Sequence, residues 1–101
     1  VISRVIGGPI MLFAIIAKDH PDSTELRANT RSNHLEYLGS HDVRYAGPIL
    51  SDDAERPIGS IVIIDAEDLS AARDFAASDP YTVAGLFAEV NVHPFKQVIS
   101  E

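Results

Sequence analysis

The sequence predicts an α+β fold built on a ferredoxin-like β-α-β-β-α-β antiparallel sheet. Two observations predict this class. Short apolar runs alternate with amphipathic segments in the order strand, helix, strand, strand, helix, strand. Right-handed crossovers then place both helices on one face of the sheet and make the first and third strands central. A length of 101 residues is enough for one domain and too short for two.

The first strand is expected at 11–17, because MLFAIIA is a continuous apolar run that is too short for a typical helix. Such a run is typical of a strand that is buried on both faces. Polar turn residues follow at 18–23, and Ser23 or Thr24 is available to cap the next helix.

The next segment, 24–40, is expected to form a helix that Gly39 ends. Spacing the residues at 100° puts Tyr37 on the solvent side and leaves one stripe for burial. Two cations and an imidazole intrude on the face that should be buried. The stripe and its edge consist of Ala28, Arg31, Leu35 and Leu38, with Arg27 and His34 at the edge.

Two strands are expected on either side of a polar hairpin loop at 51–57. The strand at 43–50 contains Pro48, which cannot donate a ladder hydrogen bond, so this strand should lie at an edge of the sheet or carry a bulge. The strand at 59–65 is a second unbroken apolar run.

A second helix is expected at 69–78, with Asp68 as its cap. Asp79 precedes a proline, which disfavours helical geometry and marks a break. Because proline is favoured at the first helical position, Asp79 is also expected to cap a short helix that runs to Leu86. The inward-facing residues of the longer helix are Leu69, Ala72, Phe75 and Ala76.

The sheet is completed by a partly alternating strand at 88–99, which Pro94 interrupts. The two central strands are apolar at nearly every position, so the sheet face without helices would expose a large apolar patch. Soluble monomers avoid such patches. We therefore predict a homodimer in which two copies pair through their sheet faces.

Composition excludes several classes of function. The net charge of −7 and the scattered basic residues argue against nucleic acid, because phosphate binding needs clustered Lys and Arg. The absence of cysteine excludes disulfides and thiol chemistry. No apolar run reaches the length of a membrane span, and a cytoplasmic location is the default expectation. Residues 1–10 lack a signal-peptide pattern and are interpreted as an N-terminal extension or a cloning remnant, which leaves 11–101 for the domain.

His34 is the candidate for proton transfer, because an unperturbed imidazole titrates near neutral pH. Arg31 lies one turn earlier and could hold an anionic group of a substrate. The alternative is an ordinary, partly buried histidine that is satisfied by a backbone carbonyl, which is the usual role of such a residue.

Asp79 is the candidate partner of the imidazole, because a capping carboxylate can also accept a hydrogen bond from a ring nitrogen. The alternative is a helix cap alone, worth about 1 kcal/mol. Ser60 lacks a Gly-x-Ser-x-Gly elbow, so we expect it to be a hydrogen-bonding wall of a pocket rather than a nucleophile. Tyr81 is expected in the core or in the pocket lining.

No metal or other cofactor is expected. The spacings of the histidines fit no tight ligand pattern, and no second carboxylate or thiol accompanies them as zinc or iron sites require. These residues are His20, His34, His41 and His93.

Five short motifs, in this order, resemble the YciI-like (YCII domain) proteins over nearly all of 11–99. They are Arg31-x-x-His34-Leu35-x-x-Leu38, Ala46-Gly47-Pro48, Gly59-Ser60, Ala76-x-x-Asp79-Pro80-Tyr81 and Val92-x-Pro94-Phe95. The resemblance implies a ferredoxin-like fold that dimerises as an α+β barrel, similar to muconolactone isomerases. It also implies a site built on a histidine and an aspartate, which map onto His34 and Asp79. A related dehydrochlorinase in chlorinated-aromatic breakdown implies proton abstraction followed by chloride loss as one chemistry.

We therefore predict a small-molecule enzyme, a lyase or isomerase, in which His34 and Asp79 transfer a proton on a small polar or anionic organic substrate. Fixed donors would steady developing negative charge in a pocket between the helices and the sheet. The alternative is a non-catalytic dimeric module that binds a small metabolite or acts as a scaffold. The residues expected to contact substrate are Arg31, Gly47, Pro48, Ser60 and Tyr81.

Overall fold

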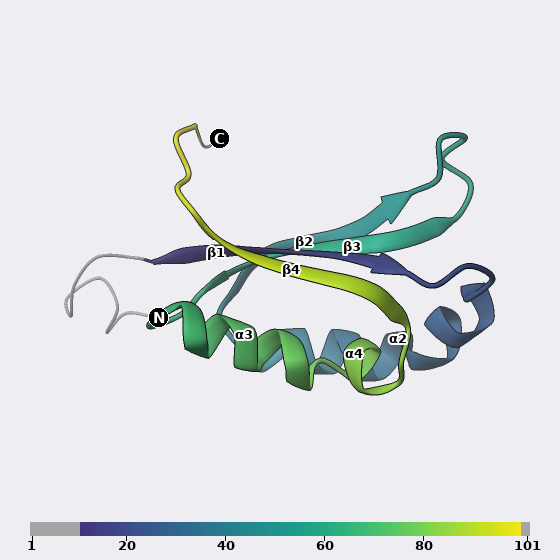
Figure 1. The fold of residues 1–101 in the computed structure, drawn as a ribbon, viewed down its shortest axis with the longest axis horizontal. Coiled ribbons are helices and arrows are strands. Elements are labelled where there is room, and N and C mark those ends of the chain that lie inside the picture. Colours follow the sequence, from purple (N-terminus) through teal and green to yellow (C-terminus); the bar gives the residue numbers. More distant parts are fainter. Residues whose placement is uncertain (1–10, 100–101) are drawn as a thin grey trace.

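A computed structural model describes residues 11–99 and confirms the predicted α+β class (Figure 1). Four strands form one antiparallel sheet in the order β2-β3-β1-β4, so the first and third strands are central, as predicted. All the helices labelled in Figure 1 cover the same face of the sheet. The interpretation of residues 1–10 falls outside the described residues. The elements are β1 (Leu12–Asp19), α2 (Thr24–Gly39), β2 (Val43–Leu50), β3 (Pro57–Asp65), α3 (Leu69–Ser78), α4 (Pro80–Val83) and β4 (Phe87–Phe95).

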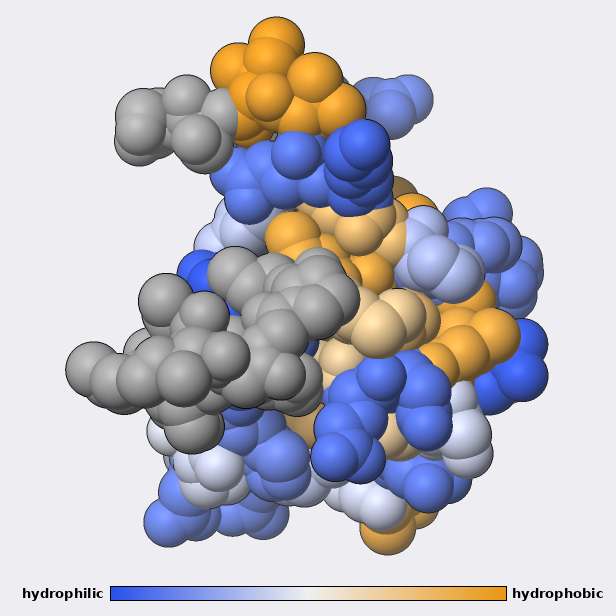
Figure 2. Space-filling model, turned by 90° about the vertical axis from the view of Figure 1, so that its left-hand side faces the viewer, coloured by the Kyte–Doolittle hydropathy of each residue, from blue (hydrophilic) through white to orange (hydrophobic). Residues whose placement is uncertain are grey.

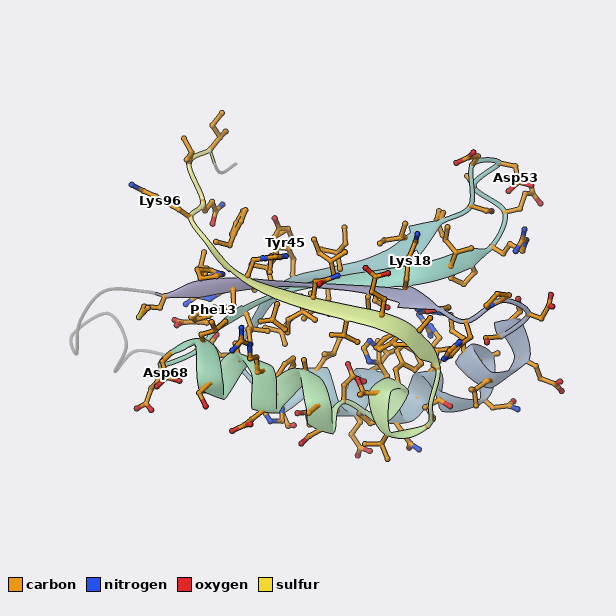
Figure 3. The ribbon with its side chains drawn as sticks, in the orientation of Figure 1. Phe13, Lys18, Tyr45, Asp53, Asp68 and Lys96 are labelled. Carbon is orange, nitrogen blue, oxygen red and sulfur yellow. The ribbon has the colours of Figure 1, made fainter. Side chains whose placement is uncertain are left out.

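The hydrophobic core lies between the helices and one face of the sheet. Phe13 and Ile15 of β1 pair with Ile64 and Val62 of β3 and point toward the helices, as Figure 3 shows for Phe13. The predicted inward face of α3 is confirmed, because its buried side chains belong to this core. From the helices, the core receives Leu38, Ala72, Phe75 and Ala76.

No helix of the described residues 11–99 lies on the opposite face of the sheet (Figure 1). Ile16 and Ile61 face each other across β1 and β3 on this side and are 41% and 42% exposed. Figure 3 shows Tyr45 and Lys18 projecting from the same side. Strand alternation therefore leaves an apolar surface uncovered in a single chain, as the unbroken apolar runs predict.

Several predicted boundaries are corrected by the structure. β1 ends at Asp19 rather than Ala17, so the first two residues predicted as a turn belong to the strand. β3 begins at Pro57, two residues before the predicted start at Gly59, so the hairpin loop is shorter. The short helix α4 ends at Val83 rather than Leu86, because the chain turns at Gly85 with φ of +81°, a conformation that suits glycine. β4 ends at Phe95 rather than 99.

Pro94 does not interrupt β4 but lies inside it, opposite Phe13 of β1. β4 is an edge strand that pairs with β1 alone, so a residue without an N–H is tolerated there. Pro48 lies in the other edge strand, β2, as predicted.

Helix α2 differs from its prediction in three details. Ser23 occupies the N-cap position, but its hydroxyl donates to the Pro21 carbonyl instead of capping the helix. Tyr37 is not on the solvent side, because its hydroxyl donates to the Phe75 carbonyl at 2.8 Å. Leu35 is 44% exposed, because this part of α2 faces a hollow rather than the close-packed core.

Among residues 11–99, no helix combines the length and the apolar character needed to cross a bilayer.

The structure predicts that Gly59→Ala destabilises the fold. A Cβ at this position would collide with the Ala17 carbonyl oxygen on the neighbouring strand and come within 3.3 Å of the Ile49 Cδ1 atom. We expect the free energy of unfolding to fall by about 2 kcal/mol, measured by urea denaturation. Gly39→Ala is the control, because a Cβ there meets nothing within 4 Å. Equal stability of the two variants would contradict the prediction.

Candidate functional site

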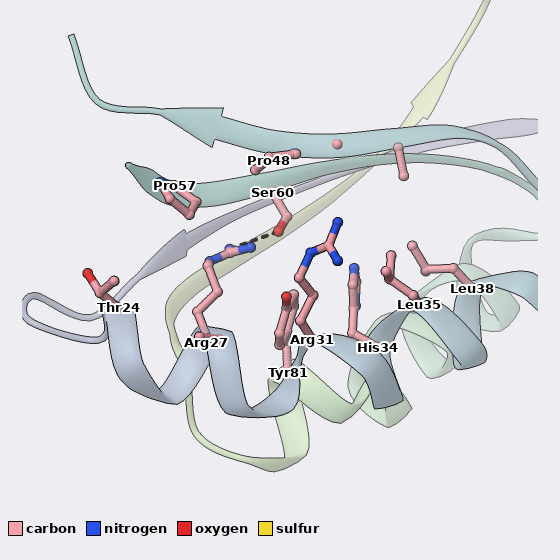
Figure 4. Close-up of a pocket in the computed structure, with 13 residues that line it drawn as sticks. Thr24, Arg27, Arg31, His34, Leu35, Leu38, Pro48, Pro57, Ser60 and Tyr81 are labelled. Carbon is pink, nitrogen blue, oxygen red and sulfur yellow. Dashed lines mark hydrogen bonds between the residues drawn. The ribbon is translucent and has the colours of Figure 1, made fainter. Parts of the chain in front are cut away.

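A pocket of about 360 Å³ lies between α2, the β2–β3 edge of the sheet and Tyr81 (Figure 4). α2 supplies Arg27, Arg31 and His34 to it, because spacings of four and three residues place these side chains on one face of a helix. Its walls are otherwise mostly apolar. The predicted site residues that line it are Arg31, His34, Gly47, Pro48, Ser60 and Tyr81.

His34 and Asp79 lie in direct contact, although 45 positions separate them in the sequence. The Nδ1 atom of His34 is 2.8 Å from Oδ1 of Asp79, and the two side chains are 8% and 7% exposed. A carboxylate can only accept, so Nδ1 is the nitrogen that donates in this pair. Asp79 is not among the residues that line this pocket, and it reaches the pocket only through its contact with His34.

Asp79 is also a helix cap, so its carboxylate both contacts the imidazole and caps α4. Its Oδ1 accepts from the Tyr81 backbone N–H at 2.9 Å, and its extended backbone separates α3 from α4. Pro80 follows at the first position of α4. The residue before a proline avoids helical geometry, so the local sequence dictates the break that brings this carboxylate to the imidazole.

Tyr81 packs against one face of the imidazole. Its ring stacks on His34 with centroids 4.0 Å apart and planes 17° apart, and it is buried. Burial raises the pKa of the Tyr81 phenol, while the charges of Arg27 and Arg31 oppose that rise without cancelling it. Tyr81 therefore stays a neutral phenol at physiological pH.

Arg27 is held by a two-bond ion pair, and it is not among the site residues predicted from the sequence. Its Nε and Nη2 atoms donate to the two carboxylate oxygens of Asp19 at 2.7 and 2.8 Å. Burial alone would lower the pKa of Arg27, but the hydrogen bond and charge of Asp19 outweigh it and raise that pKa. The sequence did contain an indication of this role, because a cation at the edge of a buried helix stripe needs a carboxylate partner.

The same guanidinium reaches two residues of the predicted site. Nη2 of Arg27 also donates to Oγ of Ser60 at 2.9 Å, and the guanidinium carbon lies 4.7 Å from the centroid of the Tyr81 ring. Figure 4 shows this bond beneath Pro48 and Pro57. Arg27 thus connects α2, β3 and α4 at one point.

Arg31 differs from Arg27 in having no carboxylate. It lines the pocket, is exposed, and makes no hydrogen bond or ion pair with any residue of the described range 11–99. Figure 4 shows its guanidinium extending toward the sheet between Tyr81 and His34. Within that same range, no group of three His, Asp or Glu side chains is close enough to hold a metal ion.

A helix-covered antiparallel sheet with a His–Asp pair beside an apolar pocket defines a ferredoxin-like α+β protein with a candidate acid–base site. The chain belongs to the family of YCII-related domain proteins, whose model matches residues 11–96.

Known relatives support this assignment. The chain is 41% identical over 97 residues to an uncharacterised protein of Haemophilus influenzae and, equally, to protein YciI of Escherichia coli O6:H1. Each alignment covers 87% of this chain and 99% of the relative. A solved structure, the 5-chloro-2-hydroxyhydroquinone dehydrochlorinase TftG of Burkholderia phenoliruptrix in complex with 2,5-dihydroxybenzoquinone, superposes with a TM-score of 0.79 at 35% identity, covering 87% of this chain and 96% of that one.

The buried ion pair predicts a large effect for Asp19→Asn. The amide keeps the shape of the side chain but leaves the Arg27 guanidinium without a compensating charge. We expect a loss of about 3–5 kcal/mol in the free energy of unfolding. In an Asp19→Leu, Arg27→Met double variant the loss should be smaller than the sum of the single losses.

Asp22→Asn is the matched control for this measurement. Asp22 is an exposed carboxylate in the turn that follows Asp19, and its positive φ of 57° suits asparagine. Its substitution should change stability by less than about 0.5 kcal/mol. Equal effects of the two substitutions in urea denaturation would show that the ion pair contributes nothing.

Proposed function

We propose that this protein is a small-molecule enzyme, a lyase or isomerase, in which His34 and Asp79 transfer a proton on a small polar or anionic organic substrate. One observation carries the proposal. The imidazole has one nitrogen bonded to a buried carboxylate at 2.8 Å, while its ring lines an apolar pocket. A carboxylate that accepts from Nδ1–H selects the tautomer whose other nitrogen, Nε2, is free to accept a proton.

In the proposed step, Nε2 of His34 removes a proton from a carbon or hydroxyl of the substrate. For an elimination, the released electron pair forms a new π bond while the bond to a leaving group, such as chloride, breaks and the leaving group takes its electron pair. For an isomerisation, His34 returns the proton to a different atom. The Asp79 carboxylate stabilises the imidazolium between the two half-steps, and Ser60 and Arg31 are placed to steady negative charge on the substrate.

The similarity to the dehydrochlorinase supports elimination as one such chemistry. The two chains align over most of their length at 35% identity. No activated serine, cysteine or metal cluster is found among residues 11–99, so proton transfer is the chemistry that the described side chains support best.

We also propose that two copies pair through the helix-free faces of their sheets and close an α+β barrel. Ile16 and Ile61 are exposed at the centre of this face. Figure 2 shows a group of apolar atoms at the top of the molecule. The C-terminal segment projects on the helix-free side of the sheet, and its Val98 and Ile99 side chains are exposed. A surface of this kind on a soluble protein is typical of an interface.

The predicted pairing can be broken by one charge. Ile61→Glu would place a carboxylate at the centre of the apolar face, and we expect it to convert a dimer to a monomer in analytical ultracentrifugation. Val83→Glu, at an exposed apolar position of α4 on the helical side, should leave the dimer intact. A monomeric wild-type protein at micromolar concentration would contradict the proposal.

Proton transfer by His34 predicts a loss of activity in two variants. His34→Ala should lower kcat by about 10²–10⁴-fold on any substrate found by screening chlorinated hydroxyaromatics and small acids for chloride release or ultraviolet change. Asp79→Asn should cause a loss of the same order while preserving the fold, because the asparagine oxygen can still accept from Tyr81 N–H. His20→Ala is the control at an exposed histidine.

The proposed effect of Asp79 on the tautomer of His34 can be measured independently of activity. Nitrogen-15 NMR of the imidazole should show the Nδ1–H tautomer in the wild type and a mixture in Asp79→Asn. If His34→Ala retained full turnover on every active substrate, the acid–base role would be wrong. If no substrate turned over and ligands still bound, a non-catalytic binding module would replace the enzyme.

A further inference from the structure

We propose that the pocket selects a small organic monoanion, with Arg31 as its anchor and the Ser60 hydroxyl as a second donor. This deepens the proposed function and rests on it for the role of His34. It adds the charge of the ligand, the residue that recognises that charge, and a positioning role for Arg27.

The charges around the pocket leave one cation without a partner among the described residues. Arg27 is held by both oxygens of Asp19, and the carboxylate of Asp79 is bonded to His34. Arg31 lines the pocket and makes no hydrogen bond or ion pair within residues 11–99. One ligand anion would therefore complete the charge pairing, with a planar guanidinium that suits a carboxylate or a similar oxyanion.

The walls of the pocket disfavour a second negative charge. They are predominantly apolar, and an ion brought among apolar groups loses hydration that only a partner charge restores. With Arg27 already neutralised, a dianion would leave one charge without such a partner. The apolar lining consists of Ala28, Leu35, Leu38, Ala46, Pro48 and Pro57.

Ser60 is held as a hydrogen-bond donor toward this pocket. A guanidinium can only donate, so the 2.9 Å bond from Arg27 makes Oγ of Ser60 the acceptor. The hydroxyl hydrogen is not used in that bond. Ser60 is buried and lines the pocket, so a bound ligand can accept this hydrogen. Arg27 thus acts as a positioning residue through Ser60.

The neutral phenol of Tyr81 adds to the same side of the pocket. Figure 4 shows Tyr81 standing between Arg27 and Arg31 with its hydroxyl toward Ser60. The hydrogen-bond donors of the pocket therefore lie near the sheet. In the proposed tautomer of His34, Nε2 is the nitrogen that accepts. The complementary ligand carries an oxyanion at the donors and an acidic C–H or O–H that faces His34. A volume of about 360 Å³ is at the low end for ligand pockets and suits a single ring.

Matched ligands test the charge selectivity without requiring turnover. The probes are 4-chlorobenzoate, its neutral isostere 4-chlorobenzamide and the dianion 4-chlorophthalate, titrated by calorimetry or by NMR of the backbone amides. We expect the benzoate to bind the wild type roughly 10–100-fold more tightly than the benzamide, as a charge-assisted hydrogen bond does. The phthalate should bind no more tightly than the benzoate.

Variants assign the selectivity to its residue. Arg31→Met should lose most of the preference for benzoate over benzamide, and Arg31→Lys should restore part of it. Ser60→Ala should weaken benzoate binding by roughly 10-fold, the effect of one hydrogen bond to a charged group. Arg73→Gln removes a cation of α3 that is exposed and outside the pocket lining, and should change nothing.

Several results would overturn the inference: equal affinity of the wild type for benzoate and benzamide, a preference for benzoate that is undiminished in Arg31→Met, a dianion that binds more tightly than the benzoate, or no binding of any probe below about 10 mM. Its failure is distinguishable from that of the proposed function. Monoanion selectivity without any His34-dependent turnover would leave the inference standing and remove the enzyme. His34-dependent turnover of neutral substrates that is unchanged in Arg31→Met would do the reverse.

Discussion

The geometry of the site depends on one buried ion pair. Arg27 and Asp19 join the first turn of α2 to the end of β1, and the pair is almost fully buried. A buried guanidinium without its carboxylate costs several kcal/mol, so α2 cannot rotate about its axis without breaking this contact. Because Arg31 and His34 lie on the same face of α2, holding Arg27 against the sheet also aims these two side chains into the pocket.

Besides contacting His34, Asp79 caps helix α4, and the local sequence requires this cap. The proline after it breaks the helix, and the free N–H groups at the start of α4 then need a cap. The carboxylate that supplies this cap also meets the imidazole, using the same oxygen for both bonds. Helix capping and the proposed proton transfer thus share one oxygen atom, and substitution by the isosteric amide changes the charge of this side chain while keeping its shape.

Much of this arrangement could be predicted from the sequence, and the predictions that were wrong or missing have identifiable physical causes. The unbroken apolar runs indicate central strands, and helix periodicity puts His34 beside the buried stripe. The same periodicity places Leu35 in the core, which is wrong, because a repeat of 3.6 cannot tell a packed core from an apolar pocket. Asp19 was assigned to a turn, because its ion pair with Arg27 forms only when the strand and the helix come together in three dimensions.

The alternation of side chains along β3 separates the pocket on one face of the sheet from the proposed dimer interface on the other. Along β3, Ser60 faces α2 and the pocket, whereas the next residue, Ile61, faces the uncovered side of the sheet. A slip of one residue in the pairing of β1 and β3 would exchange these environments, putting the serine on the apolar face and the isoleucine in the pocket. Gly59 opposes such slippage, because its lack of a side chain admits the Ala17 carbonyl at this position of the ladder. The register that sets the pocket polarity is therefore the same register that gathers the apolar side chains on the opposite face, so the proposed ligand binding and the proposed dimerisation depend on a single structural constraint.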